Sequence, residues 1–204
     1  MQEPWADLLA AISQEVTSDE SFLTGTNAAW LTAGQRATKW LGQPGASEAA
    51  LAQLEGRLQQ PLPPSYRAFL AASNGFGPID YFIYNLHPAH EVAWLIEREA
   101  ELVELWERAP TLAGSPLLAD EHYLRYDGSP PEGALRPGHL RQCLLISDWG
   151  DAGFLVLNPA VRHEGEWEAW HFANWYPGAV RYRSFLALME ASLASFRELR
   201  PPLS

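Results

Sequence analysis

Three glutamates occupy every second position from residue 164 to residue 168. On a β-strand, Glu164, Glu166 and Glu168 would point to one face, because successive side chains of a strand alternate between its two faces. Two carboxylates at a fixed separation can act as acid and base, as they do in glycoside hydrolysis. Neighbouring carboxylates on one strand are more typical of a solvated edge or a charged binding strip. We therefore predict a binding role for these glutamates, and a hydrolase that uses Glu166 or Glu168 is a remote alternative.

Two tryptophans follow the same alternation. Trp170 shares the face of Glu166 and Glu168, whereas Trp167 faces the other way. If the acidic face meets solvent, Trp170 is the better candidate for an exposed aromatic side chain. Trp167 is then expected in the hydrophobic core.

A second group of acidic and aromatic residues lies between two predicted strands. Asp148 and Asp151 flank Trp149, and aspartate and glycine are ordinary residues of a tight turn. An exposed tryptophan between carboxylates is also a suitable docking element for a basic partner, because the ring supplies desolvated contact and the acids steer the approach. The predicted partner-binding surface comprises Asp148, Trp149, Asp151, Glu164, Glu166, Glu168 and Trp170.

Other residue types that carry chemistry do not form a recognised constellation. The sequence has no Gly-rich phosphate loop, dinucleotide fingerprint or nucleophile elbow. Its single cysteine, Cys143, lies in an apolar run and is expected to be a small buried residue rather than a nucleophile. Four histidines lack the spacing of a known metal site: His87, His90, His163 and His171. We predict no catalytic residue, no metal site and no cofactor.

The composition restricts the class of partner. The formal net charge is −11 and the isoelectric point is near 4.9, which argues against a nucleic acid or an anionic membrane as the partner. An acidic surface suits solubility, and it also suits a basic protein. Nine tryptophans favour a surface that is partly aromatic.

The chain also carries signals about its compartment. A single cysteine permits no internal disulfide, which fits a reducing compartment. The first residues lack the basic segment of a signal peptide, and no apolar run is long enough to span a membrane. We expect a cytoplasmic protein, with export by a route that needs no cleavable signal as the alternative.

Two linked helices between residues 47 and 77 organise the predicted fold. The first is indicated by leucines at helical spacing and by Ser47 as its N-cap. Prolines interrupt it, and Pro64 can open the second helix, which ends at Asn74–Gly75 because both residues tolerate a left-handed backbone. Helical spacing also occurs over residues 5–16 and, more weakly, 21–31. We assign residues 1–39 to an N-terminal helical extension packed on a main domain of residues 40–204.

The remaining elements follow an order that lacks strict alternation of strands and helices. A long helix is expected over residues 89–108, and a closing helix is expected after Ser184. Strands are expected over residues 79–86, 122–126, 143–147, 153–157 and 166–172. This order predicts an α+β fold in which helices flank a mainly antiparallel sheet.

Three stretches of the chain form an ordered set of motifs. The first combines a Leu-Glu pair, the pattern LP-x-x-Y-x-x-F-L and an Asn-Gly pair, at Leu54, Glu55, Leu62, Pro63, Tyr66, Phe69, Leu70, Asn74 and Gly75. The second is CLLISDWGDAGFLVLNP, with Gly150–Asp151 in its turn, and the third begins at Ser184–Phe185. Together they resemble the SMI1/KNR4 family, also called the SUKH superfamily, over residues 40–196.

The resemblance implies an α+β fold and protein binding rather than a shared enzyme activity. Bacterial members of the family are often immunity proteins that bind and neutralise a toxin, and a fungal member is an interaction hub in cell-wall regulation. We therefore predict a non-catalytic immunity protein whose partner is a toxin with a basic surface. A regulatory or scaffold protein without a toxin is the alternative, since a fold does not fix a function.

Overall fold

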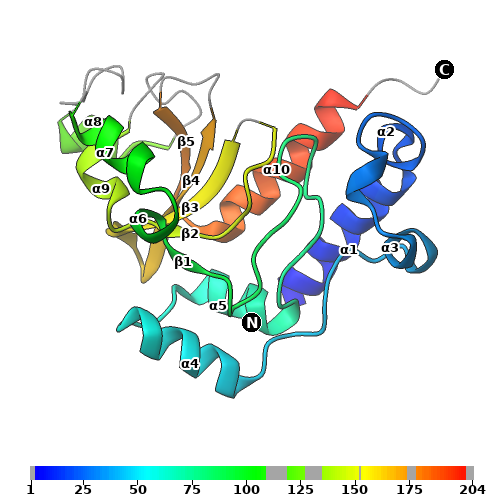
Figure 1. Cartoon of the computed structure of the whole chain (residues 1–204), viewed down its shortest axis with the longest axis horizontal. Coiled ribbons are helices and arrows are strands. Elements are labelled where there is room, and N and C mark those ends of the chain that lie inside the picture. The colour runs from blue at the N-terminus through cyan, green and yellow to red at the C-terminus, as the bar shows by residue number, and fades with distance from the viewer. Residues whose placement is uncertain (1–2, 109–118, 127–134, 152, 174–177, 201–204) are drawn as a thin grey trace.

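The computed structural model describes residues 3–108, 119–126, 135–151, 153–173 and 178–200 (Figure 1). Its centre is a five-stranded antiparallel sheet in the order β1-β2-β3-β4-β5. The strands are β1 (Ala93–Trp94), β2 (Leu144–Leu145), β3 (Gly153–His163), β4 (Glu166–Ala173) and β5 (Gly178–Tyr182). Together with the helices around this sheet, the arrangement confirms the predicted α+β class.

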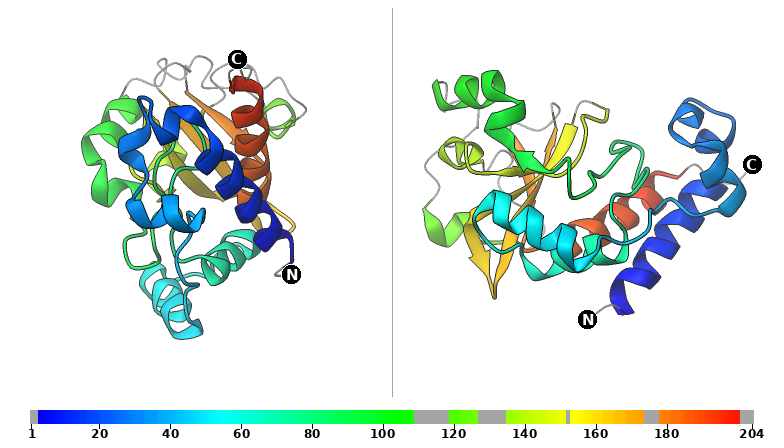
Figure 2. Two further views of the ribbon diagram at one scale, coloured as in Figure 1. Left: turned by 90° about the vertical axis from the view of Figure 1, so that its right-hand side faces the viewer. Right: turned by 60° about the horizontal axis from the view of Figure 1, so that its bottom comes forward.

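Helices cover both faces of the sheet (Figures 1 and 2). The long helix α10 (Phe185–Leu199) packs on one face, where Trp167 and Leu155 belong to the larger hydrophobic core. The other face carries Trp170 and Phe172 and is covered by shorter helices. These are α6 (Leu95–Arg98), α7 (Ala100–Arg108), α8 (Asp120–Tyr123) and α9 (Pro137–Leu140). The sheet is therefore a middle layer, with no face left wholly to solvent.

The N-terminal helices join the same core. They are α1 (Glu3–Ser18), α2 (Glu20–Leu23), the 3-10 helix η1 (Ala28–Trp30) and α3 (Ala33–Thr38). Trp5 of α1 is 1% exposed and packs against Phe69 and Phe185, with ring centroids 5.5 and 5.6 Å away. The helix predicted over residues 5–16 is confirmed, whereas the segment 21–31 forms only α2 and η1.

The predicted helix pair is present as α4 (Glu48–Leu58) and α5 (Pro64–Ala72). Ser47 caps α4 by accepting a hydrogen bond from the backbone N–H of Ala50 at 3.2 Å. Pro64 stands in the first turn of α5, where its missing N–H costs nothing. Gly75 has φ +98°, a left-handed backbone that glycine adopts without strain. These local signals explain why the sequence predicts this pair correctly.

The strand predicted over residues 79–86 is wrong. Asp80 is buried and its Oδ1 accepts hydrogen bonds from the backbone N–H groups of Phe82 and Ile83, which folds the chain back on itself. Ile79 and Ile83 are both 0% exposed, so the apolar pattern reflects a loop packed on the core. Only Leu86, at the end of the segment, forms isolated bridges to its neighbours.

The single helix predicted over residues 89–108 is also wrong. Residues 93–94 leave the helical path to pair with β2, and α6 follows directly. Glu99 then interrupts the helix with φ −127° and ψ 48°, and α7 begins at Ala100. Sheet pairing at Ala93–Trp94 overrides a pattern that fits a helix before and after it.

Two further strands differ from prediction. The segment 122–126 is not a strand: α8 ends at Tyr123, whose ring lies between the guanidinium groups of Arg136 and Arg181. The strand β5 was not predicted, because a short segment with Gly178 and Arg181 becomes a strand only by pairing with β4. The strands predicted at 143–147, 153–157 and 166–172 are confirmed, although β2 is shorter and β3 is longer than expected.

Candidate functional site

Glu168, the last carboxylate of the predicted binding strip, is enclosed in the protein. Glu168 is 0% exposed, and Nη1 of Arg181 donates a hydrogen bond to its Oε1 at 2.6 Å. The same carboxylate also accepts hydrogen bonds from the side chains of Tyr123, Tyr126, Asn158 and Trp170. Burial, followed by the charge of Glu168, raises the pKa of both tyrosines, so their hydroxyls remain protonated donors. This ion pair has a structural role, because it ties α8 and β5 to β4.

The exposure expected for Glu168 and Trp170 is therefore wrong. The two residues do share a face of β4, as their alternation predicts, but each is 0% exposed because the layer of α6–α9 covers that face. Trp167 lies in the core on the opposite face, as predicted. Water and substrate do not reach Glu168, so the geometry does not support a hydrolase in which it acts as acid or base.

The other two glutamates of the strip are separated from Glu168. The carboxylate of Glu166 accepts hydrogen bonds from the backbone N–H and the hydroxyl of Ser65 at 2.8 and 2.6 Å. It thereby supplies negative charge to the N-terminus of α5, which has no side-chain cap of its own. Glu164 is exposed, with φ 52°, in the turn between β3 and β4. The three glutamates Glu164, Glu166 and Glu168 therefore do not form one exposed acidic strip.

The side chains of the turn at residues 148–151 are exposed to solvent, unlike Glu168 of the predicted strip. Trp149 is 38% exposed; its ring packs against Phe154 with centroids 4.6 Å apart, and its Nε1 donates to Glu99 at 2.9 Å. The side chain of Asp148 is 59% exposed. Partial burial raises its pKa, but hydrogen bonds from Asn85 and His87 outweigh this and hold the pKa below its ordinary value. Its charge is therefore retained, and Asp151 is exposed beside it.

The Asn-Gly pair at residues 74–75 and the Gly-Asp pair at residues 150–151 hold this turn and the loop at residues 79–89 together. A Cβ atom on Gly150 would lie 1.8 Å from the carbonyl oxygen of Phe82, so only glycine permits this contact. The next residue, Asp151, donates its backbone N–H to the same carbonyl at 2.8 Å. At the other end of the loop, Asn74 Oδ1 accepts the backbone N–H of Ala89 at 2.7 Å. The Asn-Gly and Gly-Asp pairs therefore position one surface.

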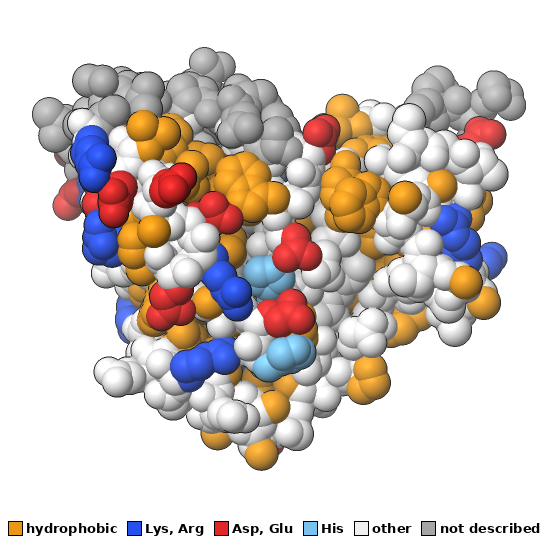
Figure 3. Space-filling model, viewed as in Figure 1, with side chains coloured by type: hydrophobic (Ala, Val, Ile, Leu, Met, Phe, Trp, Pro, Cys, Tyr) orange, Lys and Arg blue, Asp and Glu red, His pale blue; other side chains and the backbone are white. Residues whose placement is uncertain are grey.

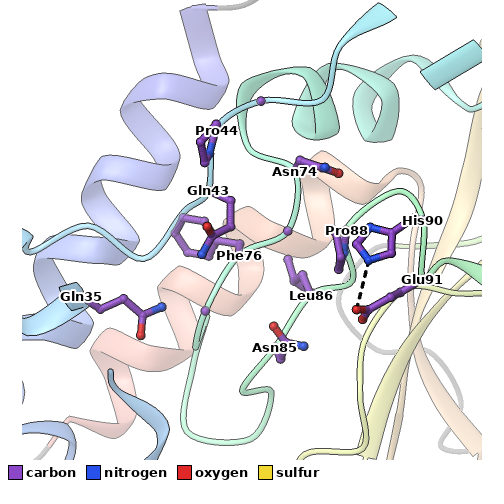
Figure 4. A pocket seen from close by; sticks show the side chains of 13 residues that line it. Gln35, Gln43, Pro44, Asn74, Phe76, Asn85, Leu86, Pro88, His90 and Glu91 are labelled. Atoms are coloured by element: carbon purple, nitrogen blue, oxygen red, sulfur yellow. Dashed lines mark ion pairs between the residues drawn. The ribbon is translucent and has the colours of Figure 1, made fainter. Parts of the chain in front are cut away.

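Two cavities lie along this surface and share Glu91. The larger, of about 590 Å³, is lined by Gln35 of α3 and by residues from the segments 43–45, 74–77 and 85–91 (Figure 4). Figure 4 shows Gln35 reaching toward it from one side, with His90 and Glu91 on the other. The smaller, of about 380 Å³, is lined by His87, Glu91, Arg98, Glu99, Leu145, Ser147, Asp148 and Trp149. On this face, acidic side chains gather beside histidines (Figure 3).

We call the group formed by Glu91, Glu99, Asp148, Trp149 and Asp151 the turn surface. The sequence indicated its turn residues, but it predicted one long helix over residues 89–108, a range that contains Glu91 and Glu99. The break at residues 93–94 brings both glutamates to the smaller cavity instead. A second exposed aromatic side chain, Trp30, stacks on Tyr84 with centroids 4.2 Å apart and is 49% exposed. Burial, followed by the charges of Asp151 and Asp80, raises the pKa of Tyr84.

The remaining candidates for chemistry have ordinary structural environments. Cys143 is buried, and burial raises the pKa of its thiol well above the usual value, so the reactive thiolate is disfavoured. His171 is half-buried, and desolvation lowers its pKa to about 4. No group of three or more histidine, cysteine, aspartate or glutamate side chains suited to a metal ion occurs among the described residues. In the same part of the chain, no helix has the length and apolar character required to cross a membrane.

Comparison with models of known protein families gives a match. The sequence model of the SMI1 / KNR4 family (SUKH-1) matches residues 45–191, which include α4, α5, the sheet and the first half of α10. The matched range contains the Asn-Gly and Gly-Asp pairs and the whole turn surface, and it begins after α3. No curated protein matches the chain.

Proposed function

Because the chain belongs to the SMI1/KNR4 family (SUKH-1), we propose that it is a non-catalytic immunity protein. In this role it binds a toxin with a basic surface and blocks the toxin's active region. The turn surface makes the contact, and the protein acts in the cytoplasm, where its single thiol stays reduced. The partner-binding residues are now Asp148, Trp149 and Asp151 from the sequence, joined by Glu91 and Glu99.

The observation that carries this proposal is the exposed acidic and aromatic character of the turn surface. Asp148, Asp151 and Glu91 are exposed, and Trp149 offers 38% of its surface to a partner. A partly exposed tryptophan supplies apolar contact area at a low cost in side-chain entropy, which is typical of residues that dominate binding energy. The carboxylates, within a chain of net charge −11, attract a basic protein and orient its approach.

The position of the turn surface also fits a binding protein. Asn74, Gly75 and Gly150 hold it on backbone contacts, and Asp80 fixes the loop beneath it. A surface fixed before binding loses little conformational freedom on contact with its partner. The buried Glu168–Arg181 pair lies on the sheet instead, where it stabilises the fold.

The proposal is tested by co-expression with candidate toxins. Each protein encoded beside this chain is expressed in a bacterial host, with and without the chain, and growth and complex formation are measured. We expect one neighbouring product to arrest growth, and we expect the chain to restore growth and to form a complex that weakens at high salt. Absence of both rescue and binding for every neighbour that arrests growth would overturn the immunity role.

A matched pair of charge variants locates the contact. The triple variant Glu91→Gln, Asp148→Asn and Asp151→Asn removes three charges from the turn surface. The control Glu101→Gln, Glu190→Gln and Glu198→Gln removes three charges from exposed positions elsewhere. We expect only the first variant to lose rescue. Equal loss in both variants would show that total charge, and not the turn surface, determines binding. Capture of housekeeping proteins without any toxin would favour the scaffold alternative.

A further inference from the structure

The smaller cavity is lined by a histidine whose ring has one buried nitrogen without a hydrogen-bond partner among the described residues. His87 is 7% exposed and lines this cavity. Its Nε2 lies 2.8 Å from Oδ1 of Asp148. A carboxylate only accepts hydrogen bonds, so in the neutral ring the proton lies on Nε2 and Nδ1 carries a lone pair. Within the described part of the chain, Nδ1 has no donor. An unmet acceptor in a buried position favours a ligand that brings a donor.

The walls of this cavity favour a cation. Three carboxylates line the cavity, from Glu91, Glu99 and Asp148, against one guanidinium, from Arg98. The pKa of Asp148 is held low by its hydrogen bonds, although partial burial acts in the opposite direction, so its charge is present at neutral pH. Trp149 also lines the cavity, and Glu99 holds its indole by the Nε1 hydrogen bond of 2.9 Å. An aromatic face beside carboxylates is a favourable environment for a positive group.

We propose that this cavity receives an arginine side chain of the protein partner. The inference rests on the proposed function, since it identifies the group that the partner places against the turn surface. A guanidinium is planar and has five N–H donors, so it can meet His87 Nδ1 and a carboxylate together while it stacks on Trp149. An ammonium group is compact and strongly hydrated, and it lacks the planar face for stacking. A cavity of about 380 Å³ is within the usual range of ligand sites.

The test uses the full chain and a small probe, acetyl-Gly-Arg-Gly-amide. Nitrogen-15 NMR follows the indole N–H of Trp149, which is assigned by the Trp149→Phe variant, and the ring nitrogens of His87. Two comparison peptides replace the arginine by citrulline, which has nearly the same shape without the charge, and by lysine. We expect saturable shifts of both signals with the arginine peptide, weaker binding of the lysine peptide and none of the citrulline peptide.

Two variants and one control separate the cavity from general attraction. His87→Phe removes the acceptor and Asp148→Asn removes one charge, so each should weaken binding about tenfold or more, as expected for the loss of a charged hydrogen bond. Glu190→Gln removes the same charge from the exposed side of α10 and should leave the affinity unchanged. If either cavity variant misfolds, the other is decisive.

Each result has a distinct meaning. The inference is overturned if citrulline or lysine binds as well as arginine, or if both cavity variants behave like Glu190→Gln. If the arginine peptide fails to bind while a neighbouring toxin is still neutralised, the arginine site is wrong and the proposed function stands. If the peptide binds in the cavity while no toxin is bound or neutralised, the arginine site stands and the immunity role is wrong.

Discussion

The protein contains two pairs of an acidic residue and a tryptophan with opposite surroundings. On β4, Glu168 and Trp170 are both 0% exposed, and the carboxylate accepts hydrogen bonds from five side chains. In the turn at residues 148–151, the side chain of Asp148 is 59% exposed and Trp149 is 38% exposed. The same residue types therefore stabilise the fold in one region and remain available to a partner in the other.

The difference arises from layering rather than from local sequence. The alternation of side chains along β4 correctly predicts that Glu168 and Trp170 share a face. Whether that face is exposed to solvent depends on the layer of helices that packs on it. The turn at 148–151 lies outside the layers, on a loop fixed by backbone contacts. A buried carboxylate requires hydrogen-bond donors from the protein for its oxygens, whereas an exposed carboxylate can accept hydrogen bonds from a ligand.

The largest effect is expected from Glu168→Gln. This change leaves the buried guanidinium of Arg181 without a counter-charge, which should lower the free energy of unfolding by about 3–5 kcal/mol. Urea unfolding measures the loss. The control Glu164→Gln alters an exposed turn and should stay within about 0.5 kcal/mol. A change below about 1 kcal/mol in Glu168→Gln would show that the pair is not the stabilising element described.

Gly150→Ala should have the next largest effect. The added methyl group would meet the carbonyl oxygen of Phe82 at 1.8 Å, so the turn must move away from the loop below it. We expect a loss of about 3 kcal/mol in stability, at the upper end of overpacking effects, and weaker binding of the toxin. Gly56→Ala is the control, because nothing lies within 4 Å of its Cβ, and a helical alanine should stabilise the chain by about 0.5–1 kcal/mol. A stable Gly150→Ala variant would contradict the role of the close contact.

Trp149→Ala should separate binding from stability. Its ring is partly exposed, so we expect the affinity for the toxin to fall by about 2 kcal/mol, roughly thirtyfold, because large aromatic side chains dominate such contacts. Calorimetric titration measures this change, and urea unfolding checks that most of the stability remains. Trp30→Ala, at the other exposed ring, is the comparison. Unchanged affinity in Trp149→Ala would remove this ring from the contact.

The pH dependence of stability should report on Asp80 beneath the turn surface. Burial raises its pKa from 3.8 to about 6, against the hydrogen bonds that favour the ionised form. Protonated Asp80 stabilises the folded state. This contribution to the free energy of unfolding is fully present below pH 3.8 and is lost as the pH rises through 6. Between about pH 7.5 and 4.5, Asp80 should therefore add about 1–2 kcal/mol to the free energy of unfolding.

The comparison with Asp80→Asn isolates this contribution. His171, with its pKa lowered to about 4, acts in the opposite direction over the same range, but it is present in both proteins. Urea unfolding at several pH values should give a steeper gain on acidification for the unchanged chain than for Asp80→Asn. Parallel curves would show that Asp80 ionises freely in the folded protein.

The parts of the fold that the sequence predicts correctly depend on local signals. Ser47 and Pro64 mark the starts of α4 and α5, and apolar spacing identifies α1 and α10 without reference to the rest of the chain. The errors concern contacts that the spacing of apolar residues does not encode. Asp80 turns the loop at 79–86, and β1 and β5 exist only through pairing with other strands. Such pairing cannot be read from the spacing within one segment.

The candidate site divides in the same way. Aspartate and glycine around Trp149 indicate an exposed turn from local chemistry alone, and the structure places them there. Glu91 and Glu99 were missed because their position depends on the break before α6. Glu168 and Trp170 were misplaced because the helices that cover their face of β4 are distant in sequence.

Amide hydrogen exchange of the complex with its toxin tests the central claim most directly. On binding, amides of residues 85–91 and 147–151 should exchange more slowly, because the turn surface becomes covered. Amides of residues 164–170 should be unchanged, since β4 and its turn are outside the proposed contact. Protection confined to residues 164–170, with the turn surface unaffected, would contradict the account.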